Sequence, residues 1–359
     1  MCIYYGDAPG LTYEKREHIF PAGLGGKMML PTGYVSDQAN ELFSPLELKL
    51  MRNSTISLIR FMEGPGKRGS LSPQKASSST ICKYETDDGG VELGFIKAGK
   101  PYPIPQISID LSQNTCHFVG PRNESTSKEI WATFKKDLLK FSGKFTAIHV
   151  AGLGSKLIIG IWEKKFYVAY GEEVPNPKFL SDKIESFCEK AKATDKSPRD
   201  THGKFELHLT EDSDSCRVYA KIAYNVLAHI KGEKFVRQSR FDKIRRWILG
   251  EIETEEFITL PRIYEKQKYL TFPESSHFCV FSRNENNKLV AIVCLYGTFL
   301  RAFEFAEWDP SSDSSRLGIE GFVCDWKKEA EYTMDEWIFN LTRILLSQNK
   351  GEKPYVGEH

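Results

Sequence analysis

The stretch that most constrains the fold of this chain spans residues 14–44 and reads EKREHIFPAGLGGKMMLPTGYVSDQANELFS. Pro21 forces a turn shortly after Glu17 and His18, because its ring fixes φ and removes a backbone donor. The glycines of GLGG then let the loop approach other backbone closely. Adjacent residues on a strand point to opposite faces, so Glu17 and His18 can share one site only where the strand ends or bulges. The stretch therefore predicts a tight turn that begins with an acidic residue and a histidine.

Glu17, His18 and Asn40 are residue types that suit an enzyme cleaving phosphodiester bonds. Such an enzyme needs a divalent cation to neutralise charge on the phosphate and a base to take a proton from water. Mg²⁺ prefers carboxylate or carboxamide oxygens, and imidazole suits the base because its pKa lies near about 6.5. Each residue also has an ordinary structural interpretation. His18 would then be a hydrogen-bonded loop histidine, and Glu17 and Asn40 would face solvent.

The combination of EHIFPAGLGG with LPTGYVSDQANELFSPLE resembles the HNH endonuclease family, the ββα-metal nucleases, over roughly residues 2–68. The resemblance implies an α+β protein with an N-terminal ββα-metal (HNH-like) module followed by a mixed α/β C-terminal region. It implies that His18 is the general base, that Glu17 is a metal ligand or supports one, and that Asn40 is the last metal ligand or a positioning residue. It also implies Mg²⁺ or Mn²⁺ as cofactor, DNA as partner, and phosphodiester hydrolysis as the reaction.

The part of the family pattern that holds a structural zinc is mostly missing. The branch of the family with an E-H-I-x-P…L-G-G pattern carries two C-x-x-C pairs. At the corresponding places this chain has CIYY at residues 2–5 and SDQA at residues 36–39. A structural zinc needs four ligands, and Cys2 alone remains, so we expect no structural zinc. We expect Tyr4, Tyr5 and Ala39 to pack in its place. This loss fits an active nuclease without zinc, and it also fits one that has lost its activity.

Glu47 lies near these residues and is a candidate for a further ligand, but the local sequence favours a structural role. In SPLE, Ser44 is a suitable N-cap, Pro45 suits the first helical position, and Glu47 stands three residues after the cap. Ser36 and Asp37 are also suitable N-caps. The pattern predicts a capping box that uses Glu47.

Three parts of the chain differ in composition. Residues 1–70 hold the HNH-like module, and residues 71–81 belong to a Gly-, Pro- and Ser-rich stretch that predicts a linker. Residues 82–359 predict a mixed α/β accessory region, with a further split expected near 192–204. Within it, apolar residues recur at helical spacing over 218–230 and stop at Gly232, which predicts an amphipathic helix. HFCVFSRNENNKLVAIVCLYG predicts two strands around an Asn-rich turn.

Two groups of basic residues are candidates for nucleic-acid binding. Arg60, Lys67 and Arg68 flank a glycine-rich loop whose amides could reach a phosphate, and a solvated loop is the alternative. Residues 231–246 hold seven Lys or Arg against two acidic residues. The acidic segment GEIETEEF follows at once, so the two segments could instead pair with each other. The candidates in this second group are Arg240, Lys243, Arg245 and Arg246.

The bulk composition narrows the function classes. A net charge of +1 argues against a uniformly basic nucleic-acid coat, and no apolar run is long enough to cross a bilayer. The eight cysteines form no C-x-x-C pair, and the start lacks the pattern of a secretory signal, so a reducing, cytoplasmic protein is expected.

The expected function is a metal-dependent DNA endonuclease, with restriction or anti-phage defence suggested by analogy alone. The alternative is a non-enzymatic nucleic-acid-binding or sensor protein that uses the module as a scaffold; the C-terminal region could mediate a homo-oligomer or bind a protein partner.

Overall fold

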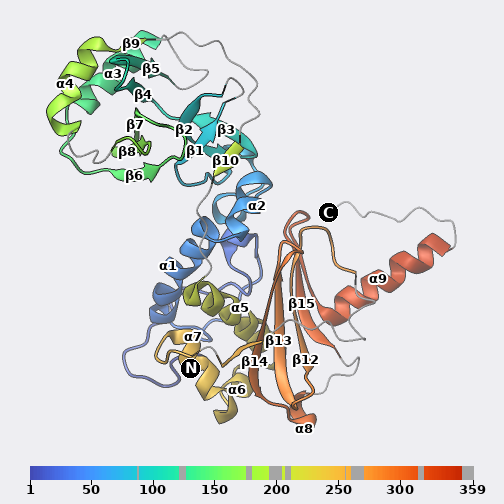
Figure 1. Ribbon diagram of the computed structural model, residues 1–359. Helices are drawn as coiled ribbons and strands as arrows, with labels where there is room; N and C mark the ends of the chain where they lie inside the picture. The colour runs from blue at the N-terminus through green and yellow to red at the C-terminus, as the bar shows by residue number, and fades with distance from the viewer. Residues whose placement is uncertain are drawn as a thin grey trace. The chain divides into compact units, whose positions relative to one another are not determined.

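The computed structural model describes residues 1–86, 89–120, 127–174, 180–193, 204–206, 212–254, 256–259, 271–313 and 319–349. The protein mixes helices and strands, which confirms the predicted α+β composition. The chain divides into two compact units, shown in Figure 1. The first unit comprises Met1–Arg60, Gly64–Ala76 and Thr210–His359, and the second comprises Phe61–Glu63 and Ser77–Leu209.

This division differs from the expected one, because residues 1–70 do not form a unit of their own. A single hydrophobic core contains Phe20 and Phe43 from the N-terminal part, Tyr224 from the middle of the chain and Phe322 from the C-terminal part. The chain leaves the first unit after Ala76, within the expected 71–81 linker, and re-enters it at residue 210. The further split expected near 192–204 falls mostly outside the described residues. The N-terminal residues therefore fold together with the accessory region rather than beside it.

The first unit is built on an antiparallel sheet of six strands in the order β11-β14-β13-β12-β15-β16. Alternation of side chains divides its two faces: Cys279 and Phe281 join the core under α5, whereas Val280 joins a smaller core with Met334 and Trp337 of α9. The predicted pair of strands around the Asn-rich turn is confirmed as β12 and β13. The strands are β11 (Ile258–Thr259), β12 (His277–Arg283), β13 (Lys288–Leu295), β14 (Phe299–Glu307), β15 (Glu320–Asp325) and β16 (Ala330–Thr333).

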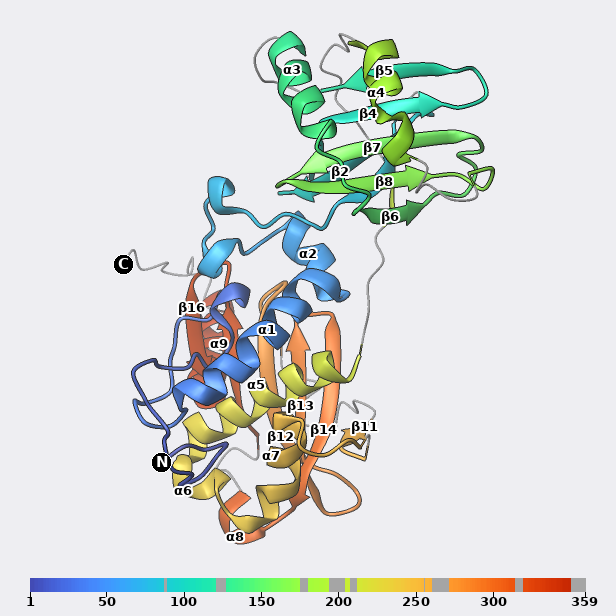
Figure 2. The ribbon, with the colours of Figure 1, turned by 90° about the vertical axis from the view of Figure 1, so that its left-hand side faces the viewer.

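Helix α5 (Ser213–Lys231) is the central helix of the first unit. Asp212 caps it by accepting a hydrogen bond from the Ser215 amide at 3.0 Å, and Gly232 ends it at φ 86°. Figure 2 shows α5 across one face of the sheet, with α1 (Asp37–Asn53) beside it. The other helices are α2 (Ile56–Met62), α6 (Glu233–Val236), α7 (Asp242–Leu249), α8 (Pro310–Asp313) and α9 (Met334–Asn349), with short 3₁₀ turns at Ala22–Leu24, Lys67–Gly69, Pro73–Lys75 and Ser239–Phe241.

The second unit contains two sheets, in the orders β10-β1-β2-β3 and β6-β8-β7-β4-β5-β9. Phe118, Phe134 and Phe187 are buried in a core between the larger sheet and the helices α3 and α4. The strands are β1 (Cys82–Glu85), β2 (Val91–Lys97), β3 (Lys100–Pro103), β4 (Gln106–Asp110), β5 (Thr115–Val119), β6 (Thr146–His149), β7 (Lys156–Trp162), β8 (Lys165–Tyr170), β9 (Lys192–Ala193) and β10 (Lys204–Glu206), and the helices are α3 (Ser127–Leu138) and α4 (Leu180–Lys190).

Candidate functional site

The predicted turn after His18 is present and is held by backbone hydrogen bonds. His18 forms an antiparallel bridge with Met29, flanked by Ile19 N–H to Met28 O at 3.0 Å and Leu30 N–H to Glu17 O at 2.8 Å. Between them the chain makes the 3₁₀ turn Ala22–Leu24. Glu17 and His18 therefore lie at a short two-stranded bridge, and helix α1 follows it in the sequence.

This turn is anchored to the C-terminal sheet. The imidazole of His277 donates from Nε2 to Leu24 O at 3.0 Å and accepts at Nδ1 from the Tyr296 amide at 2.9 Å. Burial lowers the pKa of His277 to about 3, so the ring is neutral in the folded protein. Glu331 of β16 accepts from the Met28 amide at 2.5 Å. His277 is thus a satisfied core histidine, as expected for a histidine in a strand.

The carboxylate of Glu17 contacts a buried lysine. Oε1 of Glu17 accepts a hydrogen bond from the ammonium of Lys221, which lies in the middle of α5. The same ammonium donates to Oε1 of Glu47 in α1 at 2.6 Å. The side chain of Lys221 has no exposed surface, whereas those of Glu17 and Glu47 are 13% and 18% exposed. Lys221 therefore joins two carboxylates that come from different parts of the chain.

Two further polar side chains complete this cluster, which we call the Lys221 cluster: Lys221, Glu17, Glu47, Asn225 and Tyr4. Asn225 lies one helical turn after Lys221 and donates from Nδ2 to the carbonyl of His18 at 3.0 Å. Tyr4 donates its hydroxyl hydrogen to Oδ1 of Asn225 at 2.7 Å. The cluster therefore links the first residues of the chain and the His18 bridge to α1 and α5.

The charges in the cluster act on one another. Burial opposes the charged form of Lys221, but Glu17 and Glu47 outweigh it and raise the pKa of Lys221 above its ordinary value. Burial raises the pKa of Glu47, although Lys221 opposes this change. With two carboxylates and one ammonium, the group has a formal charge of −1 when all three are ionised. Lys221 stays protonated, and it cancels half of the negative charge that would attract a metal ion.

His18 is half-buried beside this cluster. Burial, and next the positive charge of Lys221, lower the pKa of His18 from its ordinary value. Among the described residues, no side chain or backbone group hydrogen-bonds to its ring nitrogens. A neutral imidazole with free nitrogens is able to accept a proton, which is the chemistry expected of His18.

Asn40 lies in the first turn of α1, which is capped by Ser36 through a hydrogen bond from the Ala39 amide at 3.4 Å. Its Oδ1 atom is buried and has no hydrogen-bond partner within the described part of the chain. Neither Glu17 nor His18 makes a described contact with Asn40. The structure therefore gives Asn40 an unused buried oxygen in the first turn of α1.

The capping role expected for Glu47 is wrong. Helix α1 begins at Asp37 after the Ser36 cap, so Ser44 and Pro45 lie inside the helix. The SPLE pattern satisfied the rules for an N-terminus, but the cap eight residues earlier has already started the helix. Glu47 is therefore free to point from α1 towards Lys221.

A divalent cation at Glu17 does not fit the residues present. Oε1 of Glu17 already accepts a hydrogen bond from Lys221, and Asn225 also reaches this oxygen at 3.5 Å. Across the described residues, no group of three or more His, Cys, Asp or Glu side chains is arranged to hold a metal ion. Among the described residues Glu17 is paired with Lys221, and the metal-binding role of Glu17 and Asn40 stays a prediction.

The residues that were compared with zinc ligands in the sequence pack into or against the hydrophobic core. Tyr4 and Ala39 are buried in the main core, and Tyr5 packs against it. The thiol of Cys2 is fully buried and accepts a hydrogen bond from the Ser36 amide at 3.4 Å. These contacts agree with the expectation that Tyr4, Tyr5 and Ala39 pack where the family pattern would place its zinc.

Arg60 lies in α2 and has a structural role, because it anchors the glycine-rich loop that follows. It is 6% exposed, and its guanidinium donates to three backbone carbonyls: Gly23 at 3.0 Å, Met51 at 3.4 Å and Gly66 at 3.3 Å. Lys67 and Arg68 are exposed, and no acidic side chain pairs with them in the parts of the chain that are described. Of the three predicted cations, only these two are available to a partner.

The second basic group is largely neutralised by its neighbours. Lys243 pairs with Glu256 at 2.5 Å, Arg245 with Asp242 at 2.6 Å, and Arg246 with Glu251 at 3.3 Å. Arg240 donates to the carbonyl of Glu307 at 3.0 Å and stacks over Phe235 and Phe241. The acidic segment that follows the basic one therefore pairs with it, which was the alternative interpretation of this stretch.

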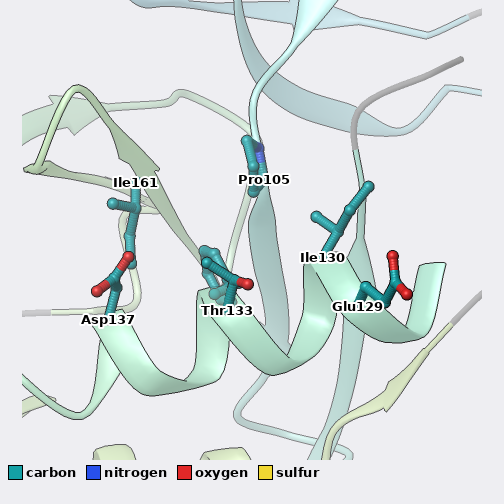
Figure 3. A pocket seen from close by; sticks show the side chains of 7 residues that line it. Pro105, Glu129, Ile130, Thr133, Asp137 and Ile161 are labelled. Atoms are coloured by element: carbon teal, nitrogen blue, oxygen red, sulfur yellow. The ribbon is translucent and has the colours of Figure 1, made fainter. Parts of the chain in front are cut away.

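A separate pocket lies in the second unit between α3 and the larger sheet, with a volume of about 370 Å³ (Figure 3). Glu129, Thr133 and Asp137 line it from α3, and Ile161 of β7 and Pro105, just before β4, line its other side. Asp137 is already paired with Lys140 at 2.6 Å. The pocket contains none of the predicted site residues.

Lys221, Asn225 and Tyr4 have no functional role in the sequence-based prediction. A signal for two of them exists: Lys221 and Asn225 are four residues apart in a helix whose neighbouring residues are apolar, so they must be buried with it. Buried polar groups need partners, which makes such a pair a candidate for a polar cluster. The identity of the partners could not be read from the spacing.

Comparisons with known proteins identify no relative. No protein-family model, no curated protein and no solved structure matches this chain. Within the described residues, no helix is both long and apolar enough to span a membrane. Function is therefore argued from the geometry of the first unit.

Proposed function

We propose that this protein binds nucleic acid through its first unit and uses the HNH-like module as a scaffold, not as a metal-dependent nuclease. The observation that carries this proposal is the ammonium of Lys221 between Glu17 and Glu47. A metal-dependent nuclease needs a carboxylate that is free to bind the cation, and Glu17 is already paired with Lys221. The loss of the zinc positions to packing also supports a scaffold.

The nucleic-acid side of the proposal is supported by an exposed basic group beside the His18 turn. Lys67 and Arg68 lie in the 3₁₀ turn Lys67–Gly69, and Gly69 packs so closely that a Cβ there would lie 2.7 Å from Ala22 O. Lys75 is also exposed, and its carbonyl lies against Gly66 of the same loop. Exposed cations without acidic partners are able to neutralise phosphates and release counter-ions.

Fluorescence anisotropy with a labelled DNA or RNA duplex at increasing KCl tests the proposal. Replacing both Lys67 and Arg68 by alanine is expected to weaken binding for all sequences and to reduce the slope of log K against log salt by about 2. The matched control replaces Lys243 and Arg246, which are neutralised by Glu256 and Glu251, and is expected to change the slope little. Equal effects of the two double variants, or no binding by the intact protein, would reject the proposal.

A second candidate function is a DNA endonuclease with His18 as general base, in restriction or anti-phage defence by analogy with the family. Two observations favour it: the ring nitrogens of His18 are free of described partners, and Oδ1 of Asn40 is buried and unpaired. Plasmid incubated with Mg²⁺, Mn²⁺ or EDTA distinguishes the two functions. Metal-dependent cutting that is lost in His18→Ala supports the nuclease, whereas salt-sensitive binding without cutting supports the scaffold.

A further inference from the structure

We infer that the ammonium of Lys221 is a covalently attached counter-ion that takes the place of a divalent cation between Glu17 and Glu47. Oε1 of each carboxylate points at the same nitrogen atom, and the Glu47 oxygen lies 2.6 Å from it. Calcium binds carboxylate oxygens at about 2.3–2.6 Å, so the two oxygens converge on Lys221 much as they would on a cation. The site therefore carries its positive charge on a side chain.

The surroundings of Lys221 keep the ammonium in this position. Its side chain has no exposed surface, and Nζ lies 5.7 Å from the centre of the Phe43 ring. An ammonium that left the carboxylates would lose two charge-assisted hydrogen bonds while still enclosed by the core. A divalent cation approaching Glu17 would meet a fixed positive charge at contact distance. Lys221 thus opposes metal binding both by occupying Oε1 of each carboxylate and by repulsion.

Removing only the charge should reverse this exclusion. Lys221→Met keeps much of the buried stem but leaves Glu17 and Glu47 facing each other without a cation. Two enclosed carboxylates that face each other repel. A divalent ion that binds both of them, with waters as its other ligands, relieves the repulsion. We therefore expect Lys221→Met to create a divalent-cation site that the natural protein lacks.

Mn²⁺ binding followed by electron paramagnetic resonance tests this inference on the full chain. The natural protein and Glu17→Gln are expected to bind Mn²⁺ alike, because Glu17 is not a ligand when Lys221 is present. Lys221→Met is expected to gain one Mn²⁺ site per chain. Its affinity for Mn²⁺ is expected to be at least tenfold higher than that of the natural protein. The matched control is Lys231→Met, on the same helix, because Lys231 pairs with a single carboxylate, Glu320.

Two outcomes would overturn the inference. One is a stoichiometric Mn²⁺ site in the natural protein that Glu17→Gln removes; this comparison remains decisive even if Lys221→Met fails to fold. The other is a folded Lys221→Met that gains no Mn²⁺ site. The inference shares the Lys221 pairing with the proposed function, but nucleic-acid binding is measured separately by anisotropy in EDTA, so failure of the inference and failure of nucleic-acid binding can be told apart.

Discussion

Two groups of ion pairs in the first unit have nearly the same lengths and opposite surroundings. Lys221 donates to Glu47 at 2.6 Å with no exposed side-chain surface, whereas Lys243 pairs with Glu256 at 2.5 Å while 64% of its side chain is exposed. Water screens the exposed pair and replaces it easily, so such pairs contribute about 0–1 kcal/mol. The buried pair cannot be replaced by water. Distance alone therefore does not show which ion pair water can replace, whereas burial does.

The same contrast changes the interpretation of basic residues along the sequence. Four of the predicted nucleic-acid contacts lie near α7, where acidic neighbours or backbone groups already bind them. Lys67 and Arg68, in a loop with fewer charges, are the ones left without an acidic partner among the described residues. A dense run of basic residues is thus less informative than two cations whose surroundings contain no acid.

The largest expected effect is the loss of the buried charge. Lys221→Met is expected to lower the free energy of unfolding of the first unit by roughly 3–5 kcal/mol at neutral pH, because two carboxylates lose their common cation. Lys243→Met, the exposed counterpart, is expected to change it by less than about 0.5 kcal/mol. Urea unfolding, with hydrogen exchange at the α5 amides as the readout, measures the loss of stability in both variants. Similar losses in the two variants would show that burial does not separate these pairs.

The next largest effect is expected from His277, whose burial should make the free energy of unfolding depend on pH in the acid range. The pKa of His277 is lowered to about 3 by burial, against about 6.5 in the unfolded chain. Below about pH 6.5 the unfolded chain binds a proton that the folded state excludes, so stability falls as pH falls from 6.5 towards 3 and is unaffected above this window. Between pH 6.5 and 4.5 the expected loss is about 2–3 kcal/mol.

His277→Asn tests the assignment, because an amide keeps a donor and an acceptor but does not titrate. Its free energy of unfolding is expected to depend less on pH between 6.5 and 4.5 than that of the natural protein. His117→Asn, at an exposed position in β5, serves as the control and should retain the natural pH dependence. An unchanged slope in His277→Asn would assign the acid sensitivity to other groups.

Local elements of this fold could be predicted from the sequence, because their signals lie within a few residues. Gly232 ends α5 where the apolar repeat stops, and the Asn-rich turn joins β12 to β13. Cys279, Cys294 and Cys324 are buried in strands, as expected of free thiols in apolar runs. Each of these depends on periodicity or turn chemistry, which one short segment contains in full.

The site could not be predicted in the same way, because its contacts join distant parts of the chain. Lys221 lies 204 residues after Glu17 and 174 after Glu47, with the second unit inserted between them. A motif shows which residue types stand together, but not whether a remote side chain has already neutralised them. The same limit explains Glu47, whose local pattern fitted a helix cap while its partner lay on α5.

The smallest effect concerns Arg60, a buried cation whose partners are neutral carbonyls. It is buried like Lys221 but, unlike Lys221 and Lys243, it pairs with no carboxylate. Arg60 donates to the carbonyls of Gly23, Met51 and Gly66, and a lysine keeps the charge but cannot reach all three from one planar group. Arg60→Lys is expected to lower the free energy of unfolding by roughly 1–2 kcal/mol. It should also weaken nucleic-acid binding, because the loop carrying Lys67 and Arg68 loses its anchor. Thermal unfolding measures the effect on stability and anisotropy the effect on binding, with Arg52→Lys at an exposed position as the control. If Arg60→Lys weakens binding no more than the control does, Arg60 does not hold the loop in its binding conformation.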